Sequence, residues 1–102
     1  MMKTADAPWD TRHIATPIWL DEIRTWLLQS YPSEAQYPPD DFDEEQRNAY
    51  EALLRLFEPG IATRVVRRYG ASNVLKHVPG QDKRHGIQIL FMKAMLQEYG
   101  AP

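Results

Sequence analysis

The segment GIQILFMKAMLQEYG, residues 86–100, decides the fold class of this chain. On a helix its residues are apolar nearly all round, which is typical of a helix at the centre of a bundle or one covered in part by another chain. The thin polar stripe consists of Gln88, Lys93 and Gln97. We predict a helix that begins after Asp82 as N-cap and runs through Tyr99, because MKAMLQEY consists of strong helix formers without a breaker.

A β-hairpin over residues 74–92 is the alternative for the same part of the chain. NVLKHV and GIQILFM contain β-branched residues in partial alternation, and they flank the turn-like sequence PGQDKRH. An isolated hairpin is marginal without further strands. We therefore favour helices here, and with them an all-α fold.

The first predicted helix is IWLDEIRTWLLQS, residues 18–30, which carries a broad apolar stripe at spacings of three and four. Thr16 is the expected N-cap, and Pro17 occupies the first helical position, where its missing N–H costs nothing. The next stretch, SYPSEAQYPPDDF at 30–42, has three prolines and no periodicity. It predicts a long extended loop, and loops of this length in compact domains usually pack on the surface.

A second helix is expected from Asp43 to about Glu58. Asp43 and Gln46 stand three residues apart, which is the spacing of a capping box, and the Pro59-Gly60 pair is expected to stop the helix. Two shorter helical pieces follow, IATRVVRRY ended by Gly70 and NVLKHV ended by Pro79. The prediction is thus a small helical bundle of four to five helices.

The length of 102 residues and the 43% hydrophobic content suit one domain with one core. We predict a flexible arm over residues 1–15 and a single helical domain over 16–102. Trp9 is the exception in the polar arm, and we expect it to pack back over the domain. The longest aliphatic or aromatic run, ILFM, is far below the ~20 residues of a membrane span. A soluble, cytoplasmic protein without membrane contact is the expectation.

Patterns typical of enzymes are missing from the sequence. The chain has no cysteine, and its three histidines show neither metal-ligand spacing nor pairing at i,i+4. There is no glycine-rich phosphate loop and no nucleophile elbow. We expect no metal, no cofactor and no catalytic activity, although a cofactor-free enzyme that uses Arg84 and His85 stays a minor alternative.

Charge is distributed unevenly along the chain. Residues 1–60 carry a net charge of −7 and residues 61–102 a net charge of +5, within an overall −2. Such asymmetry is typical of a polyanion-binding surface or of two complementary faces that meet across an oligomer or a partner. The candidate polyanion- or partner-binding residues are Arg64, Arg67, Arg68, Lys76, Lys83 and Arg84. The candidate acidic docking patch is Asp40, Asp41, Asp43, Glu44 and Glu45.

The segment RVVRRYGASNVLKHV, residues 64–78, resembles a helix-turn-helix. Its three arginines would lie within an arc of roughly 100° on a helix, opposite the apolar face. The motif requires a small residue where Val66 stands and apolar residues where Lys76 and Pro79 stand. Pro79 also shortens the second helix to about seven residues, which is short for a helix in the major groove. Sequence-specific DNA recognition is therefore not our first interpretation.

We predict a small non-enzymatic binding or regulatory protein. It would dock on a protein partner, or on a second copy of itself, through its apolar C-terminal helix and its two charged faces. The candidate apolar interface is Phe91, Met92, Met95 and Tyr99. The alternative is a nucleic-acid-binding protein that uses the basic segment 64–84.

Overall fold

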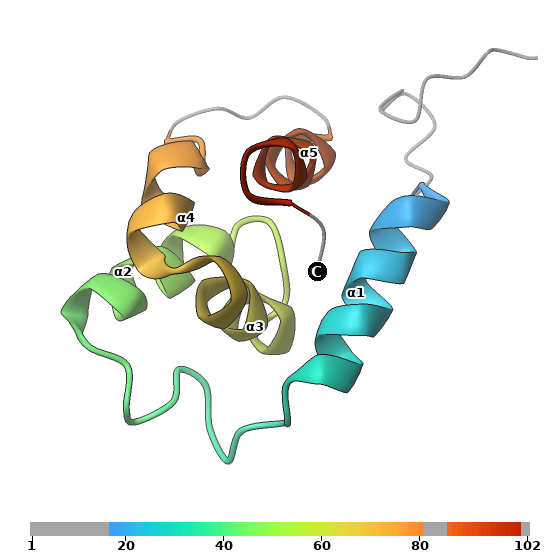
Figure 1. The fold of residues 1–102 in the computed structure, drawn as a ribbon. Coiled ribbons are helices and arrows are strands. Elements are labelled where there is room, and N and C mark those ends of the chain that lie inside the picture. Colours follow the sequence, from blue (N-terminus) through green and yellow to red (C-terminus); the bar gives the residue numbers. More distant parts are fainter. Residues whose placement is uncertain (1–16, 81–85, 101–102) are drawn as a thin grey trace, which may run out of the picture.

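The computed structural model describes residues 17–80 and 86–100, and each regular element in these ranges is an α-helix (Figure 1). The helices are α1 (Ile18–Ser30), α2 (Glu44–Leu53), α3 (Pro59–Tyr69), α4 (Ala71–His77) and α5 (Ile87–Tyr99). The prediction of an all-α bundle is confirmed for these ranges. The alternative hairpin over 74–92 is wrong, because its described residues belong to the end of α4, the turn after it and the first half of α5.

The start of α2 follows the predicted cap. The Asp43 carboxylate accepts a hydrogen bond from the Gln46 backbone N–H at 2.8 Å, and the Gln46 side chain accepts one from the Asp43 N–H at 2.9 Å. This capping box satisfies two N–H groups that the helix itself leaves without partners. The end of α2 differs from the prediction, since the helix stops at Leu53 instead of continuing to about Glu58.

Pro59 explains the earlier end of α2. It is the first residue of α3, a position that suits the fixed φ of proline and its missing N–H. Residues 54–58 therefore form the connection between two helices, and Pro59 opens a helix instead of closing one. Gly70 then separates α3 from α4 with a φ of 90°, which favours glycine, and it also occupies the N-cap position of α4. The short fourth helix therefore begins at Ala71, two residues before the predicted piece NVLKHV.

The start of α5 and the N-terminal arm lie partly outside the described residues. Helix α5 begins after Gly86, whose φ of 75° is left-handed, whereas the predicted cap Asp82 lies outside the described residues. The arm 1–15, with Trp9, also lies outside the described residues. The predicted start of the first helix is wrong by one residue, because Pro17 is the N-cap with an extended backbone and α1 begins at Ile18. None of the helices that the structure describes is long and apolar enough to cross a membrane.

The core is centred on α3. Each residue from Ile61 to Val66 is buried, and the helix contacts α1, α2 and α4. Helix α5 packs against α4 and contributes Phe91, whose ring meets that of Phe57 edge-on at 6.1 Å. Helix α1 lies at one side of the molecule (Figure 1) and buries only Leu20 and Leu27 completely.

The long connection between α1 and α2 lies against the domain. Phe42 is buried, and its carbonyl accepts a hydrogen bond from Arg47 Nη1 at 2.8 Å. The Tyr37 hydroxyl accepts one from the Glu34 N–H at 3.3 Å, and the Tyr37–Pro38 peptide bond is cis. Residues 31–43 thus cover one side of α3, and this determines the environment of the arginines on that helix.

Candidate functional site

Arg64 is not part of a solvent-facing cluster. Its exposed fraction is 4%, and its guanidinium donates to the carbonyls of Tyr31 (3.1 Å) and Gly60 (2.9 Å) and to Ser33 Oγ (3.4 Å). The expectation that Arg64 points outward with its neighbours is therefore wrong. The physical reason is the connection 31–43, which covers the face of α3 that the helical period leaves polar. Burial of a guanidinium requires hydrogen-bonding partners, and the backbone of this connection supplies them.

Arg67 is neutralised within the chain. Its Nε donates to Glu34 at 3.0 Å and its Nη2 donates to Asp41 at 3.0 Å, while the guanidinium lies 4.9 Å from the centre of the Phe42 ring. The hydrogen bond with Asp41 raises the pKa of Arg67 and lowers that of Asp41. Arg67 therefore holds the connection to α3 and has little left to offer a phosphate.

Arg68 and Lys76 are the remaining described members of the predicted basic surface. Arg68 is exposed and lies over the rings of Trp26 (5.4 Å) and Tyr69 (5.8 Å). Lys76 is exposed on α4. Lys83 and Arg84 lie outside the described residues, as does His85. The structure thus does not bring the three arginines of α3 together on one surface, and α4, with seven residues, is as short as the sequence predicts.

The acidic residues are also partly used by the fold. Asp41 binds Arg67, Asp43 caps α2, and Asp40 accepts a hydrogen bond from Gln36. Glu44 and Glu45 are exposed in the first turn of α2, where carboxylates suit the positive end of the helix dipole. The predicted acidic docking patch is therefore only partly available to a partner.

A further ion pair joins two residues of the acidic half of the sequence, Arg24 and Glu58. Arg24 of α1 donates to Glu58, just before α3, with a distance of 2.9 Å between Nη1 and Oε1. This hydrogen bond lowers the pKa of Glu58 and raises that of Arg24. The pair connects α1 to the start of α3.

The predicted apolar interface of the C-terminal helix faces inward. Phe91, Met92 and Met95 have exposed fractions of 2%, 1% and 0%. Tyr99 is half-buried, and its hydroxyl lies 3.2 Å from Nε2 of His77. The rings of Tyr99 and His77 meet edge-on. Of the two environments expected for this helix, the described residues show the interior of the bundle. These side chains complete the core of the chain itself, so the first three present no surface to a partner.

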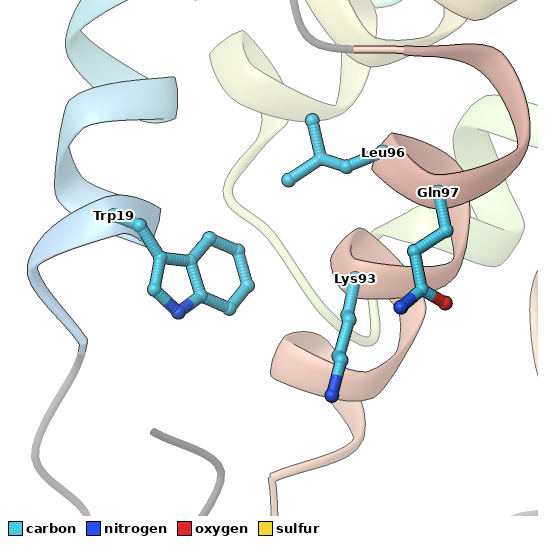
Figure 2. A pocket seen from close by; sticks show the side chains of 4 residues that line it. All are labelled: Trp19, Lys93, Leu96 and Gln97. Carbon is cyan, nitrogen blue, oxygen red and sulfur yellow. The ribbon is translucent and has the colours of Figure 1, made fainter. Parts of the chain in front are cut away.

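An apolar groove remains open between α1 and α5. We call it the α1–α5 groove; its lining residues are Trp19, Lys93, Leu96 and Gln97 (Figure 2). Trp19 extends from the first turn of α1 toward α5, while the other three residues share one face of α5 at spacings of three and four. The volume is about 200 Å³. The walls are the Trp19 ring and the Leu96 side chain, and the amine of Lys93 and the amide of Gln97 lie at the rim.

Trp19 and Leu96 were not singled out as a site by sequence reasoning. Both belong to apolar faces that predict core positions, and both do pack against the core in part. The groove arises because α1 packs chiefly on α3, so that its first turn and α5 leave a space between them. No local pattern in the sequence specifies that space.

The described ranges contain no candidate metal site. Among residues 17–80 and 86–100 there is no group of three His, Asp or Glu side chains that could hold a metal ion. His77 is engaged with Tyr99. The chain matches no protein-family model, and neither a curated protein nor a solved structure shows significant similarity to it.

Proposed function

We propose that this chain is a small non-enzymatic binding protein that docks on a protein partner through the α1–α5 groove. The observation that carries the proposal is the open apolar space between Trp19 and Leu96. In a domain whose other large apolar side chains mostly pack inward, an open apolar space is the surface that gains most from being covered.

The size of the groove favours a side chain of a protein over a free small molecule. Small-molecule sites usually have volumes of about 300–1,000 Å³. A cavity of about 150 Å³ holds one benzene ring. A groove of about 200 Å³ therefore suits one large apolar side chain, which is how the central residues of protein interfaces are usually seated.

The surroundings of the groove also support a protein ligand. Ile18, the neighbour of Trp19 in the first turn of α1, is 77% exposed and adds apolar surface. Lys93 and Gln97 provide polar groups beside the apolar walls. An apolar centre with a polar rim is the usual composition of a protein–protein interface.

Nucleic-acid binding by the basic segment 64–84 is the second candidate function. The exposed side chains of Arg68 and Lys76 favour it. It has less support than protein docking, because Arg64 and Arg67 are bound within the chain. It predicts an affinity that falls steeply with salt. For each phosphate that the protein contacts, a tenfold rise in salt concentration should lower the affinity by roughly a factor of ten.

The test is a matched pair of groove and control variants. Leu96→Asp places a carboxylate in the groove, and Leu75→Asp makes the same change at a 37% exposed position on α4. Each variant and the unchanged chain are used to capture proteins from a lysate of the native host, with and without nuclease. A captured protein is then purified and its Kd for the three chains is measured.

We expect Leu96→Asp to weaken binding at least ~10-fold, which corresponds to the ~1.4 kcal/mol or more carried by a central interface residue. Leu75→Asp should bind like the unchanged chain. Equal binding by both variants would contradict docking through the groove. Loss of capture after nuclease treatment, together with salt-dependent binding to DNA or RNA, would favour the second candidate.

A further inference from the structure

We infer that Trp9 of the same chain fills the α1–α5 groove when no partner is bound. This would make residues 7–11, APWDT, an internal competitor of the partner. Competition between Trp9 and a partner rests on the proposed function, because a docked partner would have to displace Trp9. Occupancy of the groove by Trp9 in the free chain can be tested without any partner.

The groove lies close to the point where the N-terminal segment joins α1. Trp19, which forms one wall, lies two residues after Pro17, the first described residue. Pro17 is eight positions after Trp9 in the sequence. An extended chain of that length spans up to ~26–29 Å. The segment that carries Trp9 therefore joins the domain at the groove and has ample length to turn back into it.

The chemistry of the segment matches the groove. Trp9 is the only aromatic residue among residues 1–16, and the groove has about the volume that one such ring needs. Asp10 follows Trp9 directly, and Lys93 provides the opposite charge at the rim. Pro8 precedes Trp9 and restricts the backbone, which lowers the entropy lost when the segment is ordered.

Attachment to the same chain makes even a weak contact effective. A short flexible linker gives an effective concentration on the order of 1 mM. A contact with an intrinsic Kd of ~0.1 mM would then be formed in about nine molecules out of ten. A partner would meet an open groove in only one molecule in ten, so Trp9→Ala should strengthen partner binding about 10-fold.

Disulfide trapping tests the contact directly, because the chain contains no cysteine of its own. The reporter pair is Ala7→Cys with Gln97→Cys at the groove rim. The control pair is Ala7→Cys with Asn48→Cys, an exposed position on α2. Under mild oxidation we expect the reporter pair to close within one chain at least ~10-fold faster than the control pair. Adding Trp9→Ala to the reporter pair should remove that advantage.

Equal rates for the two pairs, or a reporter rate that Trp9→Ala leaves unchanged, would overturn the inference. A disulfide that forms between chains, with a rate that rises with protein concentration, would also overturn it and would assign the groove to a second copy. Because no partner is present, equal rates or a rate that Trp9→Ala leaves unchanged do not bear on the proposed function, whereas a disulfide between chains would identify the protein partner as a second copy. Conversely, a failed capture experiment leaves the trapping result unaffected.

Nuclear magnetic resonance provides a second, independent readout. The chain has three tryptophans and therefore three indole N–H signals, of which Trp9→Phe identifies one. We expect nuclear Overhauser contacts from the Trp9 ring to the Leu96 methyl groups. An indole signal of Trp9 at the position found in unstructured peptides, without such contacts, would overturn the inference.

Discussion

The two sides of the domain core differ in the residues that line them and in how closely the chain packs there. On one side, the connection 31–43 lies on α3 and is held by charged and polar groups, chiefly Arg64 and Arg67. On the other side, α1 approaches α5 with apolar residues, yet the α1–α5 groove stays open between them. The first region is polar and closed, and the second is apolar and open.

This difference shows why charge in a sequence is a poor guide to a binding surface here. Two of the three arginines that predict a phosphate-binding face, Arg64 and Arg67, hold the connection 31–43 instead. Part of the charge asymmetry between the two halves of the sequence is balanced within the chain by the ion pairs of Arg67 with Glu34 and Asp41. Trp19, whose place on the apolar stripe of α1 predicts a core position, packs against the core only in part and forms one wall of the groove. We expect substitutions in the connection 31–43 and its arginines to change mainly stability, and substitutions in the α1–α5 groove to change mainly binding.

The largest expected effect is that of a charge in the apolar core beside the groove. Met95 is completely buried, so Met95→Asp should lower the free energy of unfolding by more than ~4 kcal/mol, enough to unfold much of a small domain. The next residue, Leu96, lines the groove and is only partly buried, so Leu96→Asp should cost less than half as much. Urea denaturation followed by circular dichroism measures both. Equal losses would mean that the groove is part of the closed core.

The second prediction concerns the closed polar region. Arg64→Met keeps the apolar stem but removes the donors to Tyr31, Ser33 and Gly60, so it should lower stability by ~2–4 kcal/mol. Arg68→Met removes an exposed guanidinium and should cost under ~1 kcal/mol. Amide hydrogen exchange in residues 31–43 should become faster in the first variant and not in the second. Similar behaviour of the two variants would mean that Arg64 does not hold the connection.

The sequence predicts the helices better than their packing. Periodicity, the Asp43–Gln46 pair and the glycine between α3 and α4 are local signals, and each corresponds to a feature of the structure. The sequence predicts the wrong roles for Pro59 and Arg64, because both roles depend on neighbouring parts of the fold. Proline both ends one helix and begins another, and the outward face of α3 becomes an inward one only when residues 31–43 lie over it.

The site could not be predicted for the same reason. Residues at spacings of three and four, such as Lys93, Leu96 and Gln97, share a face in any helix. Whether that face is covered depends on where α1 lies, which is determined by contacts between α1 and α3. A space between two helices is a property of the packed domain, and no short stretch of the chain encodes it.

The smallest expected effect concerns the ion pair between Arg24 and Glu58. The folded-state pKa of Glu58 lies below its ordinary value of 4.5, chiefly because Arg24 donates a hydrogen bond to it. A lowered pKa contributes stability above pH ~4.5 that is lost as the pH falls through the folded-state pKa. The Glu58 side chain is 52% exposed, so solvent screening keeps the contribution under ~1 kcal/mol. Arg24→Gln should therefore be slightly less stable than the unchanged chain at pH 7. The difference should shrink as the pH falls below ~4.5 and vanish once the pH lies below the folded-state pKa of Glu58.

Thermal unfolding across this pH range measures that difference, with Lys76→Gln as the control. Lys76 is exposed on α4, and the same loss of one positive charge there should give a curve parallel to that of the unchanged chain. Added salt should shrink the effect of Arg24→Gln at pH 7, because the pair is accessible to solvent. A difference that persists after Glu58 has been protonated would mean that Arg24 stabilises α1 through packing of its side chain. The link between α1 and α3 would then be apolar, like the wall of the groove that α1 provides.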